Sequence, residues 1–236
     1  MKRPDQAIDL NADLGEGCPN DLALLDRVTS ASISCGAHAG DRGTILATIH
    51  AAQARQVVIG AHPGFADRAH FGRREQAISA AEVERLILEQ CEHLALLADE
   101  SGALLRFVKP HGALYNQAQR QAEVAEGVVA AVARLGLPVL GQPGSVLDER
   151  ARAKGVRFIA EGFPDRRYRA DGRLVARTEP DAILSDPSEV ETQVVRLVEQ
   201  GVATLCIHGD DPRAVANADL VRAALRRRAI ALKSFV

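Results

Sequence analysis

The chain has 236 residues, of which 47% are hydrophobic and 25% are charged, and its formal net charge at pH 7 is −2. This length suits one domain of α/β-barrel size with a full core, and no apolar run is long enough to span a membrane. The balanced charge excludes the basic character of a nucleic-acid-binding protein, and four cysteines without zinc-finger or C-x-x-C spacing favour the reducing cytoplasm. Cys35 and Cys206 fall in apolar runs, where a thiol acts as a small hydrophobe.

The first predicted element is a strand over residues 7–14, in which apolar and polar residues alternate. The polar face carries Asp9, Asn11 and Asp13. In the first strand of a barrel this face points inward, where buried polar groups are unfavourable unless they bind a ligand or one another. The turn that follows has a carboxylate, Glu16, at its tip.

Four short apolar runs each end in a histidine, and we expect them to be strands. They are residues 32–36, 57–62, 104–108 and 203–208, and they deliver His38, His62, His111 and His208. The third run also presents Lys109 on a turn with Pro and Gly, before a helix predicted to begin near residue 117. Because parallel strands of an α/β fold end on one face, we expect the four histidines to share one cavity.

The remaining pattern alternates helices and strands. We expect helices over residues 21–28, 44–56, 79–97, 123–135, 146–154 and 188–200, and a last helix opened by residues 209–212, with further strands at 137–143 and 156–162 and a terminal strand at 229–236. A capping box, Ser79 with Glu82, marks one helix start, and Gly136 marks a helix end. No repeat or linker divides the chain, so residues 1–236 are predicted to be a single domain.

Two longer connections fall on the predicted ligand face. The first, residues 64–74, ends with Arg73 and Arg74, which could hold a carboxylate or phosphate or could simply be solvated. The second, residues 163–177, contains an Asp-Gly hairpin signal and would lower Asp165, Arg166 and Tyr168 onto a substrate.

Three chemistries are compatible with these residue types. A metal hydrolase would use a carboxylate and two histidines, metal-free hydrolysis would use one of these groups as a base, and phosphoryl transfer would use Lys109 and the arginines as charge clamps. The residues alone predict a hydrolase that acts on a small polar substrate.

Six ordered motifs carry a resemblance. They are residues 9–16 (DLNADLGE), 35–41 (CGAHAGD), 60–63 (GAHP) with 71–74 (FGRR), 108–116 (VKPHGALYN), 165–168 (DRRY) with 171–174 (DGRL), and 208–212 (HGDDP). Together they resemble the signatures of the LamB/YcsF (lactam utilisation) family over essentially the whole chain. The chain departs from that pattern at Ala37, Gly64 and Asp211, and the first two departures imply a roomier mouth.

The resemblance implies a TIM-like (β/α) barrel, seven-stranded or distorted, akin to glycoside hydrolase and deacetylase barrels. It also implies an activity, that of the A subunit of a bacterial 5-oxoprolinase, which cleaves L-5-oxoproline to L-glutamate with hydrolysis of ATP, supplied as Mg-ATP. Such subunits work with separate B and C subunits, whereas neither nucleic acid nor a membrane is an expected partner. The residues leave open the site of ATP, the presence of a divalent metal and a homo-oligomeric state.

The resemblance and the chemistry together assign candidate roles. Lys109 with Arg73 or Arg74 would balance phosphate or carboxylate charge, Asp13 or Glu16 would activate water, and His111 would protonate the leaving nitrogen. The catalytic candidates are Asp13, Glu16, His38, His62, Lys109 and His111. The candidates for binding substrate or nucleotide are Asp9, Asn11, Arg73, Arg74, Tyr115, Asn116, Arg166, His208 and Asp210.

Two other functions are compatible with these residues. Asp13, His62 and His111 occupy places that resemble the metal triad of carbohydrate deacetylases, which would make the chain a metal-dependent amide hydrolase. Alternatively, the chain is a non-catalytic subunit that only binds a lactam.

Overall fold

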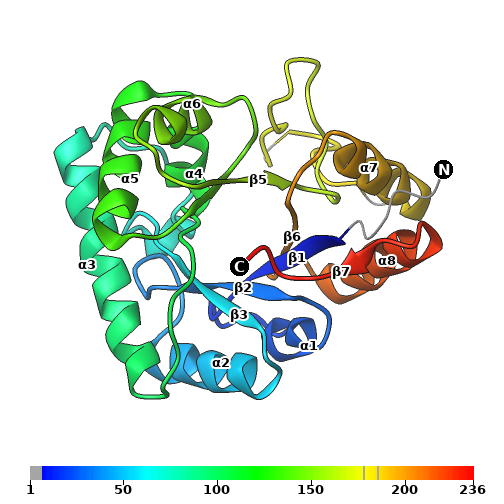
Figure 1. Cartoon of the computed structure of the whole chain (residues 1–236), viewed down its shortest axis with the longest axis horizontal. Coiled ribbons are helices and arrows are strands. Elements are labelled where there is room, and N and C mark those ends of the chain that lie inside the picture. Colours follow the sequence, from blue (N-terminus) through cyan, green and yellow to red (C-terminus); the bar gives the residue numbers. More distant parts are fainter. Residues whose placement is uncertain (1–6, 178, 185) are drawn as a thin grey trace.

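The computed structural model describes residues 7–177, 179–184 and 186–236. In this part of the chain a seven-stranded parallel sheet has the spatial order β3-β2-β1-β6-β5-β4, with β7 paired to β1. The strands are β1 (Ala7–Leu14), β2 (Ser30–Ser34), β3 (Val58–His62), β4 (Val139–Gly141), β5 (Phe158–Gly162), β6 (Thr204–His208) and β7 (Ala231–Leu232). The sheet curls on itself, with helices around its outside (Figure 1). The predicted α/β barrel is confirmed.

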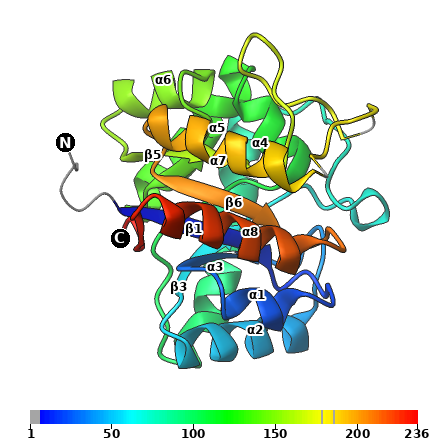
Figure 2. The same cartoon turned by 90° about the vertical axis from the view of Figure 1, so that its right-hand side faces the viewer.

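Helices connect the strands and cover the sheet. They are α1 (Asp21–Leu25), α2 (Arg42–Ala54), α3 (Ala80–Asp99), α4 (Gly112–Ala118), α5 (Ala122–Leu135), α6 (Val146–Ala153), α7 (Pro187–Glu199) and α8 (Ala214–Arg227), with a short 3₁₀ helix η1 (Arg68–His70). In the view of Figure 2, α7 and α8 lie outside β6 and β1. This arrangement leaves the ends of the strands free to build a site.

The short segment around Val108 closes the barrel between its two edge strands. Val108 forms parallel bridges with Ala61 of β3 and Val139 of β4. The amide of Val108 donates to the Pro138 carbonyl at 2.9 Å, and the amide of Lys109 donates to the Ala61 carbonyl at 2.9 Å. The expected strand over residues 104–108 is therefore wrong in extent, because only Val108 forms bridges and Leu104 is 70% exposed.

The apolar and polar faces of β1 both point into the protein, as predicted. Leu10, Ala12 and Leu14 are fully buried in the main core. Asp9 and Asn11, on the other face, are also fully buried, but each is bound by other polar groups inside the barrel. The polar residues are therefore internal, which satisfies the condition that buried polar groups must be paired.

Local signals placed several helix ends correctly. Ser79 and Glu82 form the predicted capping box at the start of α3, with both reciprocal hydrogen bonds present. Gly136 ends α5 in the left-handed conformation, at φ 66°.

An antiparallel bridge between Tyr168 and Leu174 confirms the predicted hairpin.

Three other boundaries differ from the prediction. Strand β2 ends at Ser34, so His38 lies in the loop beyond it. Helix α4 begins at Gly112, directly after His111, and not near residue 117. Helix α8 begins at Ala214, so residues 209–212 precede the helix and do not open it.

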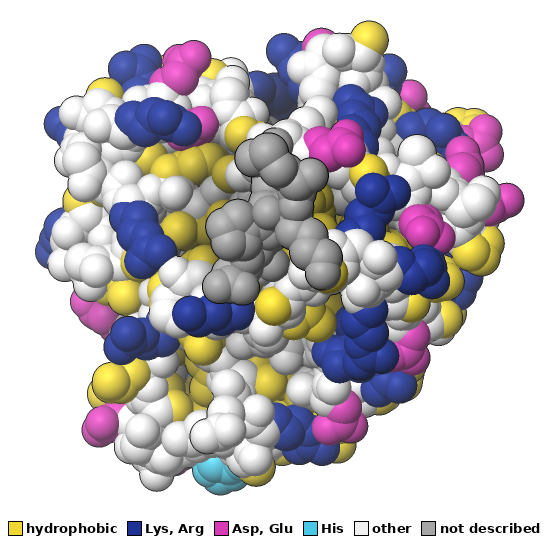
Figure 3. Space-filling view, turned by 45° about the vertical axis from the view of Figure 1, so that its right-hand side comes forward, with side chains coloured by type: hydrophobic (Ala, Val, Ile, Leu, Met, Phe, Trp, Pro, Cys, Tyr) yellow, Lys and Arg dark blue, Asp and Glu magenta, His cyan; other side chains and the backbone are white. Residues whose placement is uncertain are grey.

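The surface agrees with the modest net charge. On the face drawn in Figure 3, Lys and Arg side chains are scattered, with Asp and Glu side chains between them. Among the described residues, no helix combines the length and the apolar character needed to cross a bilayer.

Candidate active site

The carboxyl ends of the strands open into a cavity of about 700 Å³. This is within the range of about 300–1,000 Å³ that is usual for small-molecule sites. Most of the predicted site residues line it: Asp13, Glu16, His62, Arg73, Lys109, His111, Tyr115, Asn116, Arg166, His208 and Asp210. The expectation that separate strand ends converge on one cavity is therefore met for His62, His111 and His208, whereas His38 is not among the residues that line it.

Lys109 lies at the base of this cavity, 2% exposed. Its Nζ lies 2.8 Å from Asp13 Oδ1 and 2.9 Å from Glu161 Oε1. It also donates to Asn11 Oδ1 at 3.2 Å and to Cys206 Sγ at 2.8 Å. A buried ammonium flanked by two carboxylates is a fixed positive charge with its stem and head both immobilised.

The charges of this group keep Lys109 protonated. Burial acts to lower the pKa of Lys109, but Asp13, Cys206 and Glu161 outweigh it, so the pKa lies well above its ordinary value. Burial acts to raise the pKa of Asp13, but His62 and Lys109 hold that pKa well below its usual range. Burial raises the pKa of Glu161, and the Lys109 ammonium opposes this rise only in part. Asp13 is therefore the ionised partner of Lys109.

Asp9 and Asn11 lie beneath the cavity and are not among its lining residues. Asp9 accepts hydrogen bonds from the hydroxyls of Thr29 at 2.6 Å and Ser30 at 2.8 Å. Asn11 donates to Glu161 Oε1 at 3.0 Å and accepts from Lys109 Nζ. Both residues thus support the floor, and the geometry gives them no direct contact with a molecule in the cavity.

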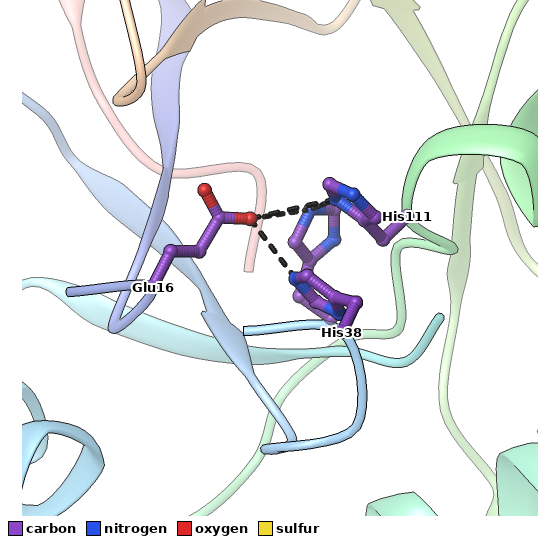
Figure 4. Close-up of side chains that lie close together, drawn as sticks. Glu16, His38 and His111 are labelled. Atoms are coloured by element: carbon purple, nitrogen blue, oxygen red, sulfur yellow. Dashed lines mark hydrogen bonds and ion pairs between the residues drawn. The ribbon is translucent and has the colours of Figure 1, made fainter. Parts of the chain in front are cut away.

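Glu16 is surrounded by three histidines. Its Oε1 lies 3.0 Å from His38 Nε2, 3.4 Å from His111 Nδ1 and 3.9 Å from His62 Nε2. Figure 4 shows His38 and His111 directed at the same carboxylate oxygen. Each of these four side chains has one nitrogen or oxygen atom that could bind a metal ion, and these atoms all lie within 4.8 Å of one another. We call them the Glu16 cluster.

Burial governs the electrostatics of the Glu16 cluster. It lowers the pKa of His38 to about 3, and the neighbouring His62 adds to the effect. It also lowers the pKa of His111, with His38 and His62 contributing. Burial together with Asp13 and Asp210 raises the pKa of Glu16. His38 and His111 are therefore neutral near pH 7, and a neutral His111 lacks the proton that its expected role as the acid requires.

Of the three residues of the expected metal triad, the structure groups only the two histidines with each other as expected. His62 and His111 do lie together, with Nε2 of the first 3.0 Å from Nδ1 of the second. Asp13 is 3.5 Å from His62 Nε2, but its nearer partner is Lys109. The carboxylate grouped with the two histidines is Glu16.

A second charged group lies around Asp210. Arg73 and Arg177 both pair with this carboxylate, at 2.5 Å and 3.2 Å. Two guanidinium groups share one carboxylate, so one positive charge remains uncompensated within the group. His208 Nδ1 lies 3.2 Å from Asp165 Oδ2, and its ring stacks on Phe163 with centroids 5.3 Å apart.

Some residues that were predicted to contact a ligand do not line the cavity or are held by other protein groups. Arg74 is exposed and is not among the residues that line the cavity. Tyr168 does not line the cavity either, since its hydroxyl accepts the Phe163 amide at 2.8 Å. Asp165 is held by His208, and Arg166, although at the cavity, donates to the Val175 carbonyl at 2.6 Å. The excursion over residues 163–177 is largely tied to itself.

Sequence reasoning missed three members of the site. Glu161 is 1% exposed on β5, where a carboxylate in an apolar strand was the available signal. Cys206 on β6 contacts Lys109, so it is more than a small hydrophobe. No local sequence pattern identified Arg177, which lines the cavity. Its pairing with Asp210 joins residues that are far apart in the sequence.

The absence of a side chain at Gly64 does not widen the mouth as expected. A Cβ there would lie 2.9 Å from His38 Nδ1 and 3.1 Å from His111 Cβ. The position therefore faces the Glu16 cluster, and neither Gly64 nor Ala37 lines the cavity.

Comparison with known proteins places this geometry in context. The model of the LamB/YcsF family matches residues 8–236. A protein of Paracidovorax citrulli, named as the A subunit of 5-oxoprolinase, is 42% identical over 250 residues, which cover 97% of this chain and 99% of that protein. A protein of the same name from Methylococcus capsulatus is 42% identical over 245 residues, covering 95% of this chain and 94% of that protein.

Solved structures agree on the fold. The lactam utilization protein from Thermus thermophilus superposes with a TM-score of 0.89 at 38% identity, covering 97% of this chain and 100% of that one. A family 4 carbohydrate esterase from Streptomyces lividans reaches a TM-score of 0.52 at 9% identity, covering 98% of this chain and 93% of that one. The second likeness concerns the barrel alone.

Proposed function

Because the chain belongs to the LamB/YcsF family, we propose that it is the A subunit of a 5-oxoprolinase, which opens the lactam of L-5-oxoproline to give L-glutamate. Support comes from relatives of that name, which are 40–42% identical over almost the whole chain. The family model matches residues 8–236, a range that contains all the residues that line the cavity.

The observation that carries the proposal is the buried Lys109 at the cavity floor. A lactam is a stable amide, and its cleavage requires charge to develop on the carbonyl oxygen. An immobilised ammonium held by Asp13 and Glu161 stabilises that charge without reorganisation during the reaction. Asp13 is ionised beside it, so in this proposal Asp13 accepts the proton of the attacking water.

ATP makes the carbonyl carbon a better electrophile. Transfer of its terminal phosphoryl group to the lactam oxygen activates the carbon, and addition of a first water molecule with expulsion of the ring nitrogen breaks the C–N bond and leaves an acyl phosphate. A second water molecule then releases inorganic phosphate and the free carboxylate. The ring nitrogen gains a proton and becomes the amine of glutamate. Lys109 would neutralise either the carbonyl oxygen or the phosphorylated oxygen, whichever subunit carries out the transfer.

The Asp210 group suits the carboxylate of the substrate. Arg73 and Arg177 retain one uncompensated positive charge over Asp210, on the wall of the cavity. A guanidinium binds a carboxylate in a bidentate, oriented manner. Anchoring the carboxylate there would present the lactam ring to the floor, where Lys109 and Asp13 lie.

The proposal includes the partners and the conditions of the reaction. We infer that the chain acts with separate B and C subunits and consumes ATP as Mg-ATP. The relatives are named as subunits, which supports an assembly of several chains. The four cysteines are free, which supports a reducing compartment such as the cytoplasm.

Replacement of Lys109 by Met tests the proposal. Lys109→Met keeps the length of the side chain and removes its charge, so ATP-dependent glutamate formation by the reconstituted three-subunit complex should fall by at least about 10³-fold. The change also leaves Asp13 and Glu161 without their cation, which should lower stability by about 3–5 kcal/mol. Glutamate release and urea unfolding measure the two effects.

A double variant separates chemistry from folding. Lys109→Met with Glu161→Gln removes one of the stranded carboxylates, so it should recover part of the lost stability and none of the activity. Full turnover by a folded Lys109→Met complex would contradict the role of this ammonium. Binding of 5-oxoproline by the wild-type complex with Mg-ATP present and no turnover would instead identify a purely binding subunit.

A further inference from the structure

The hydrogen bonds of two buried histidines determine where their ring protons lie. Nδ1 of His62 is 2.7 Å from the carbonyl oxygen of Lys109. Nε2 of His111 is 2.8 Å from the carbonyl oxygen of Phe71. A carbonyl oxygen only accepts hydrogen bonds, so each of these nitrogens carries the ring hydrogen. In a neutral ring the opposite nitrogen then presents a bare lone pair.

Those two lone pairs face each other. His62 Nε2 and His111 Nδ1 are 3.0 Å apart, with the ring planes at 90°. Glu16 Oε1 adds a third electron-rich atom to the same space. All three residues are buried, at 1–7% exposure. Three acceptors directed at one point repel each other unless a positive species lies between them.

The spacing matches that of ligands around a tetrahedral metal ion. Two ligand atoms each about 2.1 Å from such an ion are roughly 3.4 Å apart. The three separations here are 3.0 Å, 3.4 Å and 3.9 Å. The carbonyl partners on the far nitrogens are also those that metal-bound histidines use to hold their orientation.

We propose that Glu16, His62 and His111 bind a divalent transition-metal ion of the zinc class. Nothing in the proposed function assigns this donor set, and it differs from the triad suggested by sequence in using Glu16 instead of Asp13. Two imidazole nitrogens and one carboxylate oxygen are ligands that zinc accepts readily, with a further position left for a ligand from the cavity. Bound there, the ion would supply a Lewis acid facing the cavity.

His38 acts on this site as a positioning residue. Its ring stacks on that of His111 with centroids 3.8 Å apart and planes at 3°. A ring nitrogen binds a metal along a lone pair in the ring plane, so two parallel stacked rings cannot both direct lone pairs at one ion. His38 Nε2 instead lies 3.0 Å from Glu16 Oε1, and as a donor it orients that carboxylate.

A proton is the competing positive species. One proton on His62 Nε2 would satisfy the contacts with His111 and Asp13, and Glu16 Oε1 accepts from His38 Nε2, but this proton would not account for the close approach of the His111 nitrogen and Glu16 Oε1 at 3.4 Å. A metal ion satisfies all three groups. The two cases differ in a measurable quantity, the amount of metal bound per chain.

Titration of the chelator-stripped full chain with Zn²⁺ tests the site. Calorimetry and elemental analysis should show one high-affinity equivalent per chain, and Zn²⁺ should raise the melting temperature. His62→Ala, His111→Ala and Glu16→Gln should each weaken binding by at least about 100-fold. His38→Gln keeps a donor toward Glu16 and should weaken binding by only about 10-fold. His93→Ala, an exposed histidine on α3, is the matched control and should bind as the wild type does.

The outcomes either support or overturn the site. Absence of a high-affinity equivalent in the wild-type chain overturns it, as does unchanged binding by folded His62→Ala and His111→Ala variants. If a variant fails to fold, the wild-type stoichiometry and the zinc-dependent melting temperature still decide the question. Binding is measured without turnover, so a chain that cleaves 5-oxoproline with its partners but binds no zinc overturns this site alone.

Discussion

Two aspartates on the same face of β1 illustrate how surroundings determine a charge. Asp13 has the Lys109 ammonium 2.8 Å away, and its pKa is held low. Asp9 is bound only by hydroxyl groups, and burial raises its pKa to about 6. Both residues are predicted by sequence to face inward, but only the fold shows that one of them receives a cation.

The raised pKa of Asp9 leads to a pH-dependent prediction. The folded state keeps the Asp9 proton up to about pH 6, whereas the unfolded chain loses it near pH 3.8. The stabilising effect of this proton is complete below pH 3.8 and is lost as the pH rises through about 6. Asp9→Asn should therefore gain stability relative to the wild type between pH 4 and pH 7, by at most about 3 kcal/mol.

Urea unfolding of both proteins across this pH range measures the difference. Asp99→Asn, at the exposed end of α3, is the control carboxylate. A stability difference between Asp9→Asn and the wild type that stays constant from pH 4 to pH 7 would show that Asp9 is ionised in the fold throughout.

Elements whose signals are local were predicted well. The alternation of β1, the capping box of α3 and the glycine that ends α5 depend on residues within a few positions of each other. The length of the strand before Lys109 was predicted less well. Its bridges connect β3 to β4, and no local sequence pattern indicates such long-range pairing. Its apolar composition suggested a longer strand than the barrel can accommodate.

The capping box of α3 is a test at the scale of one element. Ser79 accepts the Glu82 amide, and Glu82 accepts from the Ser79 backbone and hydroxyl. Ser79→Ala should therefore destabilise the protein by about 1 kcal/mol. Ser79→Thr keeps the hydroxyl and serves as the control in the same urea unfolding measurement. Equal stability of the Ala and Thr variants would show that the cap contributes nothing.

At the scale of the whole molecule, the C-terminal segment meets the closure of the barrel. The ring of Phe235 packs edge-on against Phe107, with centroids 5.2 Å apart. The Phe235 carbonyl accepts from Arg157 at 2.7 Å, and β7 extends the pairing of β1. Residues from the two ends of the chain and from its middle thus share one contact region. We propose on this basis that the chain is a single folding unit.

Phe235→Ala tests this coupling. Loss of a half-buried aromatic ring should lower the free energy of unfolding by about 1–3 kcal/mol, while the molecule still unfolds in one transition. Circular dichroism and calorimetry should report the same midpoint. Val236→Ala, at the exposed neighbouring position, should change stability little. Separate midpoints for the two probes would indicate two independently folding parts.

The sequence by itself determined the polar face of β1 and the histidines that follow the strands, and the resemblance of its motifs to a family implied the barrel. The first two features follow from the residue period of a strand and from short-range turn chemistry, which neighbouring residues specify. Only the tertiary structure decided that Glu161 joins Asp13 at Lys109, and that Glu16 contacts His38 and His111. These pairs come from different strand ends, and which of several similar side chains meet depends on strand register and side-chain direction inside the closed barrel.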